Sequence, residues 1–135
     1  MDAKTTTIDK SRLPSRHTTV GPTKAPHRSY LYAMGLSTAE INQPLVGVAS
    51  CWNEAAPCNI SLMRQAQVVK KGVAAAKGTP REFCTITVTD GIAMGHQGMK
   101  SSLVSREVIA DSVELTMRGH CYDALVGFAG CDKSL

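Results

Sequence analysis

The sequence predicts an α/β fold in which a parallel sheet carries flanking helices. Three strand-like runs, "LVGVAS" at 45–50, "FCTITVT" at 83–89 and "DALVGFAG" at 123–130, are separated by two helical patterns. Apolar strands that alternate with helices are typical of a parallel sheet covered on its faces. Ligands of such sheets bind at the carboxyl ends of the strands, so the loops after the three runs are the first places to look for a site.

The segment before the first strand predicts little regular structure. Residues 1–27 carry Thr, Ser, Arg and Pro without hydrophobic periodicity, which indicates an extended N-terminal arm. A short helix is expected over "RSYLYAMGL" at 28–36, with Gly35 near its end as a C-cap. "STAE" has the Ser-x-x-Glu form of a capping box, so Ser37 is expected to begin another brief helix.

The two longer helices have different patterns. Apolar side chains of the first, within 59–77, recur at alternating steps of four and three, which predicts an amphipathic helix: Leu62, Ala66, Val69, Val73 and Ala76. The second, at 102–118, has a single charged stripe formed by Glu107, Asp111, Glu114 and Arg118. Its other positions are nearly all apolar or small, so we expect it to be mostly buried, although a chain of 135 residues offers little to bury it against.

Composition limits the class of protein. At 135 residues the chain is long enough for one domain, and 43% hydrophobic with only 4% aromatic residues predicts an aliphatic core. The net charge of +4 is spread out, with no basic stripe and interleaved aromatics, so we expect no nucleic-acid partner. No apolar run approaches the roughly 18 residues of a membrane span, so we expect no membrane partner and a cytoplasmic location. In that compartment five cysteines are expected to be thiols or metal ligands.

The loop after the first strand, "SCWNEAAPCN", contains Cys51 and Cys58. Their spacing excludes the Cys-x-x-Cys pattern of zinc ribbons and redox motifs, so at most one of them is expected to point into a shared site. A buried, apolar role remains an open alternative for either residue. Cys84 and Cys121 are interpreted as small buried side chains.

The loop after the second strand, "TDGIAMGHQGMKSS", has glycines that allow backbone to approach a ligand. Met99 stands where the Walker pattern requires glycine directly before lysine, so the pattern does not favour nucleotide binding. Asp90 is placed to bind a hard cation, or alternatively to cap a turn. His96 is either a ligand or acid–base group, or a loop histidine whose nitrogens are satisfied locally.

The third loop, "GCDKSL", brings Cys131, Asp132 and Lys133 to the end of the last strand. A thiolate is a soft metal ligand and a carboxylate a hard one. Side by side they indicate two metal groups: an iron-sulfur cluster on the thiolate and Mg²⁺ on the carboxylate.

Four stretches resemble the family of dihydroxy-acid, phosphogluconate and sugar-acid dehydratases. They are "GPTKAPHRSYLYAMGL", "GVASCWNEAAPCN", "EFCTITVTDGIAMGHQGMKSSLVSREVIADSVE" and "DALVGFAGCDKSL". The resemblance implies a hydro-lyase that removes water from a small 2,3-dihydroxy acid, giving a 2-keto acid in valine and isoleucine biosynthesis. It also implies a homodimer of the full-length protein.

The resemblance further implies the roles of particular residues. Cys58 and Cys131 would bind an iron-sulfur cluster, with the 2Fe-2S type favoured over 4Fe-4S. Asp90, Asp132 and Lys133 would bind Mg²⁺, the lysine as a carbamate formed with CO₂. An ammonium cannot bind a cation, whereas its CO₂ adduct is a carboxylate, and burial can supply the neutral amine that the reaction needs.

Members of the family are several times longer, which implies that residues 28–135 are the N-terminal part of the α/β domain of a two-domain enzyme. A third cluster cysteine, a further Mg²⁺ glutamate, the base serine and a C-terminal barrel domain would lie outside the chain, which alone is expected to be inactive. Two alternatives remain open. One is a phosphogluconate or other sugar-acid dehydratase, and the other is a short, non-catalytic protein that binds metal through Cys58 and Cys131.

Overall fold

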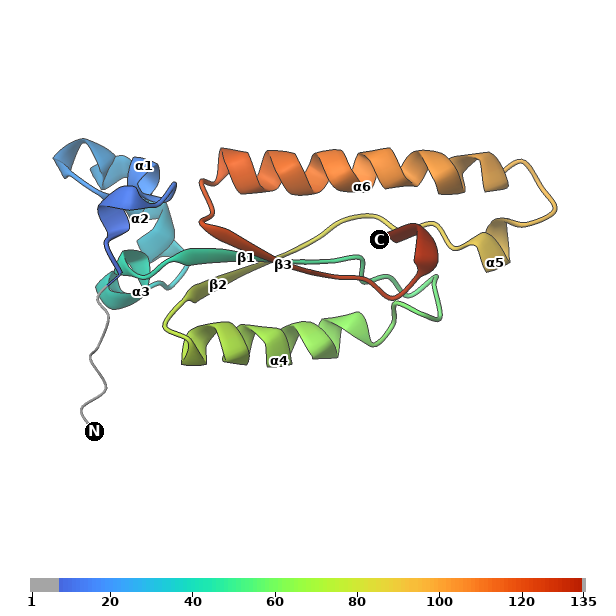
Figure 1. Cartoon of the computed structure of the whole chain (residues 1–135), viewed down its shortest axis with the longest axis horizontal. Helices are drawn as coiled ribbons and strands as arrows, with labels where there is room; N and C mark the ends of the chain where they lie inside the picture. The colour runs from blue at the N-terminus through green and yellow to red at the C-terminus, as the bar shows by residue number, and fades with distance from the viewer. Residues whose placement is uncertain (1–7, 135) are drawn as a thin grey trace.

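The computed structural model describes residues 8–134 and has three layers, with helices on both faces of a parallel sheet (Figure 1). The strands are β1 (Leu45–Ser50), β2 (Thr79–Cys84) and β3 (Ala124–Phe128), in the order β2-β1-β3. The helices are α1 (Arg16–Thr19), α2 (Ala25–Ala33), α3 (Thr38–Asn42), α4 (Leu62–Ala75), α5 (Asp90–Ala93) and α6 (Met99–Gly119). Three 3-10 turns complete it: η1 (Lys10–Arg12), η2 (Pro22–Lys24) and η3 (Asp132–Ser134). The predicted fold class is therefore confirmed.

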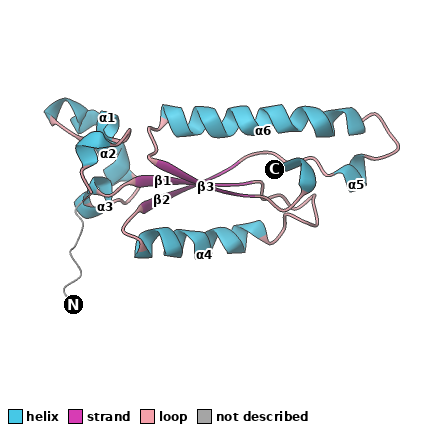
Figure 2. Ribbon diagram, in the orientation of Figure 1, coloured by secondary structure: helices cyan, strands magenta, loops and turns pink. Residues whose placement is uncertain are grey.

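The central strand β1 forms the middle of the core. It pairs in parallel with β2 from Leu45↔Thr79 to Ser50↔Cys84, and with β3 on its other side. Leu45, Val48 and Ala49 are buried, as expected for a strand covered on both faces. α4 lies on one face of the sheet and α6 on the other (Figure 2).

The second strand lies earlier in the chain than the predicted segment 83–89. β1 ends at Ser50, and Thr85 donates the last backbone hydrogen bond to the Ser50 carbonyl at 2.8 Å. The β-branched residues beyond Thr85 therefore have no strand to pair with. Pro80 is tolerated inside β2 because β2 is an edge strand of the three.

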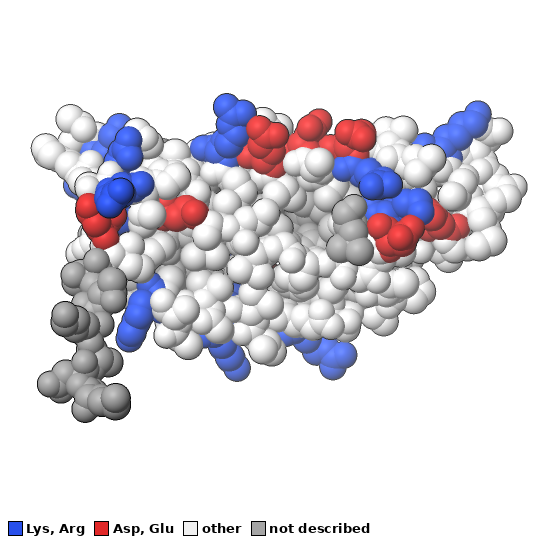
Figure 3. Space-filling model, in the orientation of Figure 1, with Lys and Arg blue, Asp and Glu red and all other residues white. Residues whose placement is uncertain are grey.

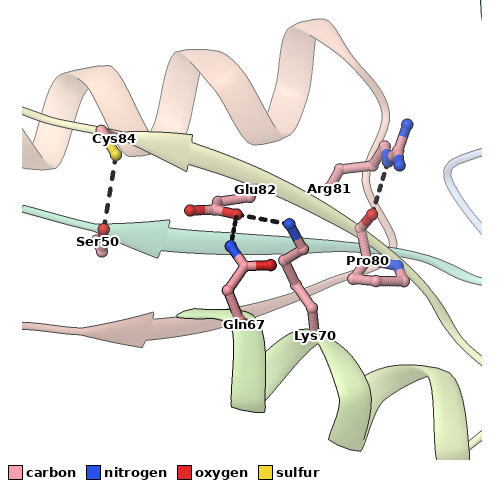
Figure 4. Close-up of polar contacts among 7 residues, drawn as sticks. All are labelled: Ser50, Gln67, Lys70, Pro80, Arg81, Glu82 and Cys84. Atoms are coloured by element: carbon pink, nitrogen blue, oxygen red, sulfur yellow. Dashed lines mark hydrogen bonds and ion pairs between the residues drawn. The ribbon is translucent and has the colours of Figure 1, made fainter. Parts of the chain in front are cut away.

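Helix α4 confirms most of the predicted apolar stripe, since Leu62 and Ala66 are buried and Val69 and Val73 are half-buried, whereas Ala76 lies beyond the helix and is exposed. Its polar side also contacts β2. Figure 4 shows Gln67 and Lys70 pointing at Glu82, with Lys70 Nζ 2.7 Å and Gln67 Nε2 3.3 Å from the same carboxylate oxygen. These contacts fix α4 along the edge strand.

The predicted extended arm is wrong for the part that the structure describes, and residues 1–7 lie outside it. Residues 10–24 form α1 and two 3-10 turns instead. Ser15 is fully buried, and both its amide and its hydroxyl donate to the Asp123 carboxylate. Tertiary contact of this kind stabilises short helical turns that have no hydrophobic period of their own.

The short helices that follow agree better with the sequence. α2 begins three residues earlier than predicted, and Gly35 follows it with φ +86°, the conformation of a glycine C-cap. The capping box is confirmed: Ser37 Oγ accepts from the Glu40 amide, and the Glu40 carboxylate accepts from the Ser37 amide. That hydrogen bonding with Ser37 lowers the pKa of Glu40.

Helix α6 is less buried than its composition predicts. Its buried residues are two serines, Ser102 and Ser105, whereas Leu103 and Leu115 are 58% and 70% exposed. The reason is geometric, since a sheet of three described strands can cover only one narrow face of a helix of 21 residues. None of the helices within residues 8–134 has the length and apolar character needed to cross a membrane.

Candidate functional site

The three loops predicted to carry chemistry meet at the carboxyl edge of the sheet. β1 lies between β2 and β3, so the loops that follow the three strands are neighbours, beside η3 and α5 (Figure 1). The hydroxyls of Thr87 and Ser134 lie 3.1 Å apart and join the second loop to the third. Position at this edge is what the parallel topology predicts for a ligand site.

The first and third loops touch through their backbones at Gly130. A Cβ built on Gly130 would lie 2.7 Å from the carbonyl carbon of Cys58, and closer still to its carbonyl oxygen. Real Cβ atoms do not approach backbone this closely, so only glycine permits the contact. The residue after this glycine is Cys131, and the contact therefore places the Cys58 and Cys131 segments side by side.

The thiols of these loops differ in environment. Cys58 is exposed and Cys131 is half-buried, and both are free. Cys51 is buried, with its sulfur 3.1 Å from the Thr85 hydroxyl, so it has the structural role that remained open in the sequence. Cys84, predicted to be buried, is exposed instead because β2 is an edge strand.

Asn59 organises the loop that carries Cys58. It is fully buried, its amide nitrogen Nδ2 donates to the Cys51 carbonyl at 2.5 Å, and its backbone N–H donates to Ala56 at 2.8 Å. Its Oδ1 is the one buried side-chain oxygen or nitrogen without a partner within residues 8–134. Sequence reasoning missed Asn59, since an asparagine after a cysteine in a loop carries no periodic pattern.

Asp90 is the first residue of α5 and follows the second strand's loop. Ser102 of α6 donates its hydroxyl proton to Asp90 Oδ1, while Asp90 Oδ2 lies 3.3 Å from Lys133 Nζ. The hydrogen bond from Ser102 is the main cause that lowers the pKa of Asp90, and Lys133 lowers it further. Asp90 is therefore an ionised carboxylate at neutral pH, the form that binds a cation.

Lys133 bridges two of the predicted ligands. Its Nζ lies 2.5 Å from Asp132 Oδ2 and 3.3 Å from Asp90 Oδ2, so opposite charges lie together at η3. Figure 3 shows positive and negative side chains side by side on this face of the molecule. Hydrogen bonding to Asp132, then to Asp90, raises the pKa of Lys133. The expected lowering by burial is wrong in this structure because the two carboxylates outweigh the desolvation of the ammonium.

His96 has both ring nitrogens occupied within its own loop. Nε2 lies 2.9 Å from the Ile92 carbonyl, and Nδ1 accepts from the Gly98 amide at 3.0 Å. The structure therefore supports the local structural role for this histidine.

Beside His96 a pocket of ≈ 300 Å³ extends from Ala56 of the first loop to Thr89, next to Asp90. That volume suits a small molecule.

The donors at this edge match parts of two metal sites. Two free thiols on touching loops are suitable partial ligands for an iron-sulfur cluster, and two carboxylates around one cation are suitable for Mg²⁺. The Lys133 ammonium contacts both of those carboxylates, at 3.3 Å and 2.5 Å. Within residues 8–134 no group of three or more His, Cys, Asp or Glu side chains is assembled for a metal ion. The residues present therefore fit an iron-sulfur cluster and Mg²⁺, and they supply only part of the ligands of each.

Fold and site together define an α/β domain that gathers thiols and carboxylates at the carboxyl edge of its parallel sheet. Residues 43–135 match the N-terminal domain of the dihydroxy-acid/6-phosphogluconate dehydratases. The chain belongs to this family. It is 90% identical over all 135 residues to dihydroxy-acid dehydratase 2 of Mesorhizobium japonicum and 85% identical to the dihydroxy-acid dehydratase of Parvibaculum lavamentivorans.

Similarity extends to relatives of lower identity. The dihydroxy-acid dehydratase of Metallosphaera sedula is 56% identical over 126 residues, which are 93% of the chain. The chain spans 23% of the length of the relatives from M. japonicum and P. lavamentivorans. It therefore corresponds to the N-terminal portion of a much longer protein in these relatives, as the sequence resemblance implies.

Proposed function

We propose that this chain supplies part of the active site of a dihydroxy-acid dehydratase, which removes water from 2,3-dihydroxy-3-methylbutanoate and similar acids in the cytoplasm. The observation that carries the proposal is the meeting of the Cys58, Asp90 and Cys131–Lys133 segments at one edge of the sheet. The family and the names of the relatives at 85–90% identity support the same reaction. A homodimer of the full-length protein is part of the proposal.

In this proposal Cys58 and Cys131 bind an iron-sulfur cluster of the 2Fe-2S type, and Asp90, Asp132 and Lys133 bind Mg²⁺. When bound, the cluster would supply a Lewis acid for the departing 3-hydroxyl, and Mg²⁺ would supply a cation for the carboxylate and the 2-hydroxyl of the substrate. The exposure of Cys58 leaves its thiolate accessible, and the buried Asn59 behind it keeps the loop in place.

Lys133 has two states in this proposal. As an ammonium it neutralises Asp90 and Asp132, as the structure describes. To become a Mg²⁺ ligand it must lose a proton to solvent, after which the amine nitrogen adds to the carbon of CO₂ and a second proton is released. Because the Lys133 ammonium contacts both carboxylates, we infer that carbamate forms only as a divalent cation takes over those contacts.

The turnover assay uses a chimera in which this chain replaces the matching segment of the M. japonicum relative. We expect the chimera to convert 2,3-dihydroxy-3-methylbutanoate to the 2-keto acid, and the 135-residue chain alone to give no product above a blank. Asp90→Asn should lower kcat/KM at least about 100-fold, since even outer-shell changes at metal sites cost 10- to 100-fold. Asp111→Asn, on the exposed side of α6, is the matched control and should leave turnover unchanged.

Three results would contradict this assignment in different ways. Product from the chain alone would show that it contains a complete site. A chimera that dehydrates only 6-phosphogluconate would support the sugar-acid alternative. Iron-sulfur absorbance without turnover of either acid would support a metal-binding protein without catalysis.

A further inference from the structure

Ser102 is a buried hydroxyl in an unexpected place. It lies in the first turn and a half of α6 with 0% of its surface exposed, on a helix whose leucines at 103 and 115 face solvent. Burying a hydroxyl is unfavourable unless its hydrogen bonds are satisfied. A helix that buries a serine and exposes leucine therefore indicates a specific polar partner in the interior.

That partner is Asp90. The Ser102 hydroxyl donates to Asp90 Oδ1 across the turn that joins α5 to α6. A second buried serine contacts the backbone of Ser102, because Ser105 Oγ donates to the Ser102 carbonyl at 2.6 Å. The two serines are the buried members of α6, so the inner face of this end of the helix is polar, and Ser102 is the one that contacts the carboxylate.

The hydrogen bond determines which carboxylate oxygen is available. With Oδ1 held by Ser102, the other oxygen of Asp90 faces Lys133 Nζ at 3.3 Å, on the side of the Asp132 carboxylate. Without Ser102, rotation of the Asp90 side chain would be free to direct either oxygen toward α6 or solvent. The distance between the two carboxylates would then no longer be fixed.

We propose that Ser102 is a positioning residue that fixes the side chain of Asp90 so that one oxygen points to the Asp132–Lys133 turn for a divalent cation. This inference rests on the proposed function, since it requires Asp90 to bind the cation. Ser102 itself does not contact the ion. It acts on cation affinity through Asp90, as hydrogen-bond partners behind a metal ligand do.

The test measures Mg²⁺ binding to the chimera by titration calorimetry, with far-UV circular dichroism and iron-sulfur absorbance recorded on the same samples. Ser102→Ala is expected to raise the dissociation constant for Mg²⁺ about 10- to 100-fold without changing the dichroism or the cluster absorbance. Ser101→Ala, which removes an exposed hydroxyl one residue away, is the matched control and should bind Mg²⁺ unchanged. Ser102→Thr keeps the hydroxyl and should stay within about threefold of the unsubstituted chimera.

The outcomes separate this inference from the function on which it rests. Unchanged Mg²⁺ affinity in Ser102→Ala, beside an unsubstituted chimera that binds Mg²⁺, would overturn the role of Ser102 alone. Absence of Mg²⁺ binding by the unsubstituted chimera would overturn both the magnesium assignment and the role of Ser102. If Ser102→Ala does not fold, Ser102→Thr decides, because loss of affinity in a folded Thr variant would contradict the proposal.

Discussion

Gly130→Ala is expected to abolish iron-sulfur loading of the chimera while leaving most of its helix content intact. The new Cβ would lie 2.7 Å from the Cys58 carbonyl carbon and 3.0 Å from Asn59 Oδ1. The atoms on the Cys58 side belong to the backbone and cannot rotate away from the new Cβ. The two loops must therefore move apart by about an ångström or more. Cluster absorbance and iron content per chain, beside far-UV circular dichroism, measure the effect.

The matched control for this substitution is Gly127→Ala, three residues earlier in β3. A Cβ at Gly127 would meet nothing within 4 Å, so the chimera that carries it should load iron normally. Normal loading of Gly130→Ala would show that the two thiol loops tolerate separation. Loss of loading in both variants would mean that neither glycine tolerates an added side chain, and the contact with Cys58 would not be the cause.

Asp123→Ala is expected to destabilise the chain by about 3 kcal/mol, because its carboxylate accepts hydrogen bonds from both the N-terminal turns and β1. Within residues 8–134 it accepts from the Ser15 amide at 2.8 Å, from the Ser15 hydroxyl at 2.6 Å and from the Leu45 amide at 2.8 Å. Ser15 is fully buried, so its donors would be left without partners. Urea denaturation of the chain measures the free energy of unfolding.

The control is Asp111→Ala, which also removes an aspartate carboxylate, but from the exposed side of α6. No hydrogen bond or ion pair of Asp111 is found in the described part of the chain. We expect its effect to be within about 0.5 kcal/mol. Equal destabilisation by the two substitutions would contradict the role of Asp123 as the link between the N-terminal turns and β1.

The convergence of the site was predictable because it follows from topology. Once three strands are parallel, their carboxyl ends share one edge, and Asp90 and Lys133 are brought to 3.3 Å although they are distant in sequence. The capping box at Ser37 was predictable for the opposite reason, since it depends only on residues three apart.

Other features depend on contacts that no local pattern encodes. β2 ends at Cys84 because β1 ends at Ser50, although the β-branched run continues to Thr89. The buried role of Ser102 is hidden in a helix whose leucines suggested an apolar interior. Hydrogen bonding to Asp132, and then to Asp90 on a different loop, raises the pKa of Lys133, so burial alone predicted the wrong direction.

Iron-sulfur absorbance of single-cysteine variants of the chimera tests whether this chain contributes two thiolate ligands from touching loops. We expect Cys58→Ser and Cys131→Ser each to lose the cluster. Cys84→Ser, at an exposed thiol on β2, and Cys121→Ser, at a half-buried thiol after α6, should retain it. Full cluster absorbance in both Cys58→Ser and Cys131→Ser would contradict the claim, as would loss of the cluster in the Cys84 and Cys121 variants alone.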